Sequence, residues 1–97
     1  MNDLEEWRLK IDAIDLQLVT LLNERAQCAM EIGKVKLAQG LEAYSPRRED
    51  EVMQQVTAGN AGPLSTQAIR RLFERIIDES RSVERIYMHG QQKPASR

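Results

Sequence analysis

The 97-residue chain has one cysteine, one histidine and few aromatic residues, and its charges nearly cancel. Because Cys28 is the only cysteine, a disulfide within the chain is excluded, and no group of Cys, His and carboxylate residues has the spacing of a metal site. The formal net charge of −1, without a long block of either sign, argues against nucleic-acid or anionic-membrane surfaces. No apolar run is long enough to span a membrane, and the acidic start lacks a signal peptide's apolar segment. We therefore expect a cytoplasmic protein.

The familiar catalytic groups are missing as well. The sole histidine, His89, lies near the end of the chain, where a Ser-His or Cys-His pair is not expected, and there is no glycine-rich phosphate loop. A chain without these groups suits a reaction that depends on substrate orientation and electrostatic stabilisation rather than on a covalent intermediate. We predict neither a metal nor a cofactor.

What the chain does have is a composition typical of helices, rich in Leu, Ile, Glu, Arg, Gln and Ala. The first predicted helix spans about 3–39, with Asp3 as a candidate cap and no proline before Pro46. Such a helix is about 55 Å long, whereas a compact chain of this size has a radius of gyration of about 13 Å. We therefore predict an all-α, intertwined helical homodimer. A kink at Gly33 or a break before Lys36 is the alternative.

Two shorter helices follow. Ser45 as cap and Pro46 as first residue predict a second helix to about Val56 or Thr57. Ser65 or Thr66 then caps a third, which reaches about Met88. Three helices per chain give one domain over 1–90, and we expect residues 91–97 to form a polar, disordered tail.

Two cations interrupt the apolar stripe of the first helix. At 100° per residue, Arg25 and Lys36 project into the middle of the sector formed by its leucines and isoleucines. Either carboxylates elsewhere in the protein pair with them, or they bind an anionic ligand, and the stripe alone does not decide between the two. Their side chains, about 16 Å apart along the axis, can converge on the two ends of a small dicarboxylate.

Arg8 precedes Arg25 by 17 residues, or about 25 Å along the same helix, which is too far for both to hold one small ligand within a chain. Arg8 then acts across the dimer interface or is a solvated surface arginine. In the third helix Ser80 and Glu84 interrupt the apolar face, as the two cations do in the first.

Five short motifs occur in an order that resembles the all-helical class of chorismate mutases. They are Arg8-x-x-Ile11-Asp12-x-Ile14-Asp15, Leu21-Leu22-Asn23-Glu24-Arg25-Ala26, Glu31-Ile32-Gly33-Lys34-x-Lys36, Tyr44-Ser45-Pro46-Arg47-Arg48-Glu49 and Ile76-Ile77-Asp78-Glu79-Ser80. The resemblance spans about Leu4 to Glu84. It implies rearrangement of chorismate to prephenate by an intertwined dimer of three-helix subunits.

The resemblance also implies roles for residues of this sequence. Arg25 and, from the other subunit, Arg8 bind the substrate carboxylates with help from Ser80, while Lys36 donates to the breaking ether bond. Arg48 is the arginine that the second helix contributes to the site, and Glu49 accepts a hydrogen bond from the ring hydroxyl of the substrate. Ile32 and Ile77 form part of the apolar wall of the substrate site.

Two positions depart from the best-known pattern of that family. Ser45 stands where some members have an aspartate near the substrate hydroxyl, and Glu84 stands where some have a glutamine that donates to the ether oxygen. An ionised carboxylate only accepts hydrogen bonds, so Glu84 donates only when it is protonated. We therefore expect activity to fall toward alkaline pH as Glu84 ionises.

Other functions remain open at this point. Lyases that eliminate pyruvate from isochorismate look similar and use an equivalent lysine. A non-catalytic regulatory dimer is a second alternative, although a scaffold has no reason to keep cations on an apolar stripe. A DNA-binding helical dimer fits the net charge worst.

Overall fold

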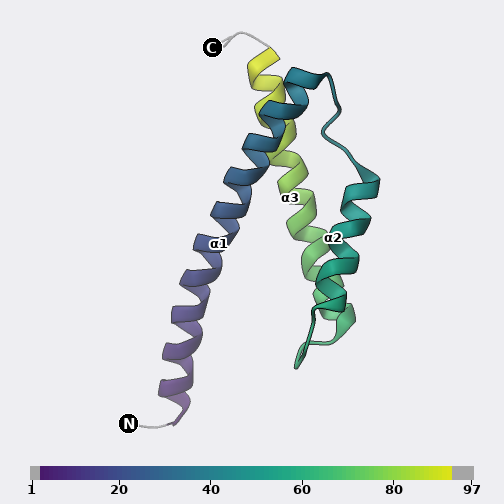
Figure 1. Cartoon of the computed structure of the whole chain (residues 1–97). Coiled ribbons are helices and arrows are strands. Elements are labelled where there is room, and N and C mark those ends of the chain that lie inside the picture. Colours follow the sequence, from purple (N-terminus) through teal and green to yellow (C-terminus); the bar gives the residue numbers. More distant parts are fainter. Residues whose placement is uncertain (1–2, 93–97) are drawn as a thin grey trace.

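The computed structural model describes residues 3–92, which form three helices joined by two loops (Figure 1). Helix α1 spans Asp3–Gln39, α2 spans Pro46–Ala58 and α3 spans Thr66–Gln92. The described residues contain no strand, so the predicted all-helical class is confirmed.

Helix α1 continues unbroken through Gly33 and Lys36 and ends at a glycine turn. Gly40 has a φ of +72°, in the left-handed region that glycine adopts without strain. Its N–H donates to the Leu37 carbonyl at 3.3 Å, and the Leu41 N–H donates to the Lys36 carbonyl at 2.8 Å. This pair of bonds is a Schellman motif, which ends the helix and turns the chain back toward Lys36.

The starts of α2 and α3 differ in how their first N–H groups are satisfied. Ser45 occupies the cap position of α2, but its side chain makes no capping hydrogen bond, so the predicted role of its hydroxyl as a cap is wrong. Pro46 at the first position leaves one N–H fewer to satisfy. In α3 the Ser65 hydroxyl accepts from the Ala68 N–H at 3.0 Å, as predicted. Helix α3 continues to Gln92, beyond the predicted end at Met88.

Both α1 and α2 pack against α3, and they do not pack against each other. Helix α1 lies close to α3 at Gly33, which is buried: a Cβ at this position would lie 3.5 Å from the Glu84 Cα and from the Tyr87 ring. Gly33 therefore lies at a contact between the two helices beside Lys36 and Glu84, where an added Cβ would make ordinary van der Waals contact.

The N-terminal half of α1 extends away from α2 and α3 (Figure 1). Its apolar side chains are exposed, among them Trp7, Ile11, Ile14, Leu18 and Leu22, and the described chain measures 56 × 34 × 16 Å. The radius of gyration is 17.3 Å, against about 13 Å for a compact domain of 100 residues. Helices α2 and α3 are too short to cover this stripe.

Three further observations complete the description of the chain. Cys28 is exposed, because α3 covers another side of α1. Within residues 3–92, no helix is long and apolar enough to cross a membrane. Of the tail predicted over 91–97, the first two residues belong to α3, and the other five lie outside the described residues.

Candidate active site

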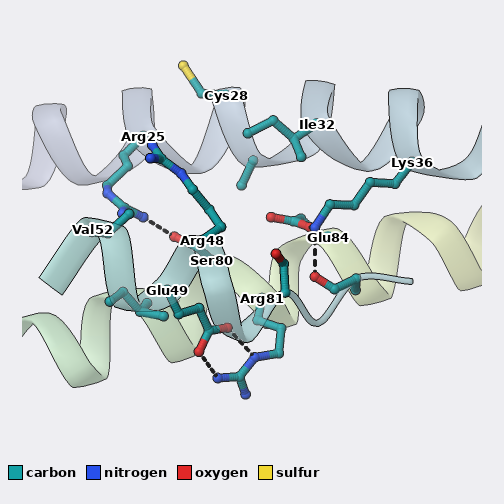
Figure 2. A pocket seen from close by; sticks show the side chains of 14 residues that line it. Arg25, Cys28, Ile32, Lys36, Arg48, Glu49, Val52, Ser80, Arg81 and Glu84 are labelled. Carbon is teal, nitrogen blue, oxygen red and sulfur yellow. Dashed lines mark hydrogen bonds and ion pairs between the residues drawn. The ribbon is translucent and has the colours of Figure 1, made fainter. Parts of the chain in front are cut away.

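A pocket of about 230 Å³ opens where α1 and α2 diverge above α3 (Figure 2). Helix α1 forms one wall, α2 and the loop before it form the opposite wall, and α3 forms the floor. The lining residues are Arg25, Cys28, Ala29, Ile32, Lys36, Ala43, Ser45, Arg48, Glu49, Val52, Ile77, Ser80, Arg81 and Glu84.

Seven of the eight site residues predicted from the sequence line this one pocket: Arg25, Lys36, Ser45, Arg48, Glu49, Ser80 and Glu84. The eighth, Arg8, does not. It lies on the extended half of α1, where it pairs with Glu5 at 3.9 Å and its side chain is 65% exposed. Within one chain, Arg8 is a surface arginine.

Lys36 and Glu84 form a buried ion pair across α1 and α3. The Lys36 Nζ donates to Glu84 Oε1 at 2.8 Å and to the Ala43 carbonyl at 2.7 Å. The side chains are 16% and 11% exposed. Glu84 is therefore the carboxylate that pairs with Lys36 on the apolar stripe. The Ala43 carbonyl, in the loop after the Gly40 turn, is a second acceptor.

The charge of Arg25 has a neutral hydrogen-bond partner rather than a carboxylate. Its guanidinium donates to the Ser80 hydroxyl on α3 and, within the described residues, to no carboxylate. Figure 2 shows the guanidinium directed across the pocket toward Ser80. A half-buried arginine whose partner is neutral keeps its attraction for an anion. Arg25 is thus the cation that structural pairing leaves uncompensated.

Arg48 lies at the outer edge of the pocket on α2. Its only ion pair within the described residues is with Glu51 at 3.5 Å, one turn further along the same helix, and its side chain is 62% exposed. An exposed pair of this kind contributes about 0–1 kcal/mol, so little holds Arg48 away from a ligand.

Arg81, which no pattern in the sequence distinguishes, holds Glu49 by two hydrogen bonds. Its Nε and one terminal nitrogen donate to the two carboxylate oxygens of Glu49, at 2.8 and 2.9 Å. These hydrogen bonds, followed by the charges of Glu49 and Asp78, raise the pKa of Arg81 above its ordinary value and outweigh the opposing effect of burial. Arg81 therefore stays charged, and Glu49 is held on the pocket wall.

The pocket carries an excess of positive charge. Four cationic side chains line it, Arg25, Lys36, Arg48 and Arg81, against the two carboxylates of Glu49 and Glu84. Apolar side chains, including Ile32 and Ile77, complete its walls. Glu51 and Asp78, which lie outside the lining, also pair with Arg48 and Arg81, so Arg25 is the cation most available to a ligand. A cationic lining beside apolar walls suits a small anion with a hydrocarbon framework. Among the described residues, no cluster of His, Cys, Asp and Glu is arranged to hold a metal ion.

The chain matches a known protein family over most of its length. The profile of the family described as chorismate mutase type II matches residues 7–85, which include every predicted site residue.

Curated relatives and a solved structure are named as bifunctional chorismate mutase/prephenate dehydratases or as a chorismate mutase. The chain is 37% identical to a bifunctional chorismate mutase/prephenate dehydratase of Pseudomonas aeruginosa over 86% of its length, and 41% identical to that of Neisseria gonorrhoeae over 80%. It spans 24% and 21% of the lengths of those two proteins, that is, about a quarter or less. A solved structure of chorismate mutase from Thermus thermophilus has a TM-score of 0.84 and 33% identity, over 87% of this chain and 96% of that one.

Proposed function

This chain belongs to the chorismate mutase type II family, and we propose that its pocket binds chorismate and catalyses the rearrangement to prephenate. In this reaction one C–O bond breaks and one C–C bond forms within a single molecule, so no outside acid, base or oxidant is consumed. The observation that carries the proposal is the cationic lining of the pocket, four cations against two carboxylates, with Arg25 paired to no carboxylate among the described residues; this favours a ligand that carries carboxylate groups.

Arg25 binds one substrate carboxylate. It is half-buried, its partner is the neutral Ser80 hydroxyl, and its planar guanidinium matches a carboxylate bidentately. Ser80 supports Arg25 by fixing its orientation before the substrate arrives. Arg48, on the opposite wall, is placed to approach the same ligand from α2.

Lys36 stabilises the negative charge that develops on the ether oxygen. Its Nζ has three donor positions, of which Glu84 and the Ala43 carbonyl occupy two, so one N–H remains for the substrate. A fixed, partly buried donor of this kind acts where charge appears in the transition state, without reorganising during the reaction.

Glu49 accepts the hydrogen bond of the ring hydroxyl, and Ser45 lines the pocket nearby with a hydroxyl that caps no helix. Glu84 holds Lys36 in place when ionised and can donate to the ether oxygen only when protonated. No step requires a cofactor.

We propose further that two chains form an intertwined homodimer. The apolar stripe on the extended half of α1 has no cover within the chain, and a second copy carries an identical long stripe that can pair with it. In such a dimer Arg8 of one subunit reaches the pocket of the other, which accounts for an arginine that lies about 25 Å from Arg25 along its own helix.

A cytoplasmic location and a catalytic domain over residues 1–90 belong to the same proposal. Activity in the soluble cell fraction, and full activity in a chain shortened to residues 1–90, would support them.

The direct test is incubation of the purified chain with chorismate and identification of the product by NMR. We expect prephenate, and the same assay with isochorismate is the control for pyruvate elimination. Salicylate from isochorismate without prephenate from chorismate would replace this proposal with the lyase activity.

A further inference from the structure

We propose that Arg81 is a positioning residue that fixes Glu49 as a hydrogen-bond acceptor for the ring hydroxyl, and so sets the preference for substrates that carry this hydroxyl. The inference rests on the proposed function. It concerns a residue that does not itself need to touch the substrate.

The contact between Arg81 and Glu49 has the geometry of a bidentate fork. Two nitrogens of one guanidinium meet two oxygens of one carboxylate at 2.8 and 2.9 Å (Figure 2). Two parallel bonds fix the plane of the carboxylate as well as its position, which a single bond does not. The two side chains are 24% and 23% exposed, so surrounding atoms also restrict them.

The fork leaves Glu49 with capacity for a substrate. An ionised carboxylate offers about four lone-pair sites, and Arg81 uses one on each oxygen. The remaining sites of an ionised carboxylate accept hydrogen bonds and cannot donate them. The wall at Glu49 therefore favours a hydroxyl, which can donate, over a hydrogen atom or a second carboxylate.

Arg81 is itself held from two other sides. One terminal nitrogen donates to Asp78 Oδ1 at 3.2 Å, one turn earlier in α3, and the guanidinium carbon lies 5.0 Å from the centre of the Tyr44 ring. Tyr44 belongs to the loop before α2, and Glu49 belongs to the first turns of α2. Arg81 thus ties Glu49 to the helix that also carries Ser80 and Glu84, so the acceptor keeps a fixed place relative to the other groups of the pocket.

The test measures discrimination between two substrates. Chorismate is compared with an analogue that keeps both carboxylates and the enolpyruvyl ether but lacks the ring hydroxyl. In Arg81→Met we expect kcat/KM for chorismate to fall about tenfold, in the range for a lost hydrogen bond to a charged group. The value for the analogue should change less than about twofold, because the analogue never uses Glu49. The preference for chorismate then falls about tenfold or somewhat less.

Two further variants make the ratio interpretable. Arg81→Lys keeps the charge but not the fork, and we expect an intermediate preference. Arg75→Met removes an arginine from the exposed face of the same helix, where it pairs with Glu79 at 2.7 Å, and should leave the preference unchanged. A ratio of two rate constants does not depend on how much of a variant is folded.

An equal loss for both substrates in Arg81→Met would show that Arg81 is structural or binds a substrate carboxylate, and either result overturns the inference. An unchanged preference overturns it too. Failure of the unmodified chain to convert chorismate would instead refute the proposed function, so the two failures are distinguishable.

Discussion

Replacement of Lys36 by methionine separates the two explanations for a cation on an apolar stripe. Lys36 pairs with Glu84 at 2.8 Å, and both side chains are largely buried. If the lysine is there only to complete an ion pair, its loss harms stability alone. If it also stabilises the transition state, its loss harms turnover even when stability is restored.

The effect on stability follows from what remains in the pocket. Lys36→Met leaves Glu84 as an unpaired carboxylate whose side chain is 11% exposed. Removing one partner of a buried ion pair typically lowers the free energy of unfolding by about 3–5 kcal/mol. For a domain of this size each 1 kcal/mol lowers Tm by about 4–8 °C, so we expect a fall of about 12 °C or more at fixed protein concentration.

The double variant Lys36→Met with Glu84→Gln removes the unpaired charge. We expect it to recover most of the lost stability, because an uncharged amide costs far less to bury than an ionised carboxylate. Turnover of chorismate should stay lower than that of the unmodified chain by about two orders of magnitude or more in both variants, the effect of losing one preorganised donor.

Thermal unfolding followed by circular dichroism gives the first quantity, and the disappearance of chorismate absorbance gives the second. Glu84→Gln alone completes the cycle and measures the coupling between the two residues. Recovery of activity together with stability in the double variant would refute the reasoning, since Lys36 would then act only as a partner for Glu84.

Two other predictions follow from the pocket and the stripe. Arg25→Ala should lower turnover by about two orders of magnitude or more while Tm changes little, because Arg25 donates to a neutral hydroxyl; near-normal turnover would remove it from the site. Leu18→Glu on the exposed stripe should shift the assembly to monomers in light scattering and abolish activity, whereas an active monomer would contradict the shared site.

The helices were predictable because their limits depend on local signals. The end of α1 at Gln39, the proline at the start of α2 and the capping hydroxyl of Ser65 all lie at the predicted places. Local signals also misled: Ser45 has the identity and position of a cap, yet its hydroxyl caps nothing. Gly90 did not end α3, since a single glycine weakens a helix by only about 1 kcal/mol.

The site was predictable where a residue type conflicts with its surroundings. Arg25, Lys36 and Glu84 stand out because charge interrupts an apolar face. Arg81 does not stand out, since α3 carries other arginines at Arg75 and Arg85 that are exposed. Only the packing of α2 on α3 brings Arg81 to Glu49, a residue 32 positions away, and periodicity within one helix contains no information about such a contact.

The most direct test of the central claim, that one pocket is completed by Arg8 of a second copy, mixes two inactive variants. Arg8→Ala and Arg25→Ala are unfolded together in equal amounts and refolded, so that about half of the dimers contain one chain of each kind. In each mixed dimer one site receives both intact arginines and the other receives neither. We predict recovery of about one quarter of the unmodified chain's activity. Activity no higher than that of the separate variants, in a sample shown to contain mixed dimers, would contradict the account.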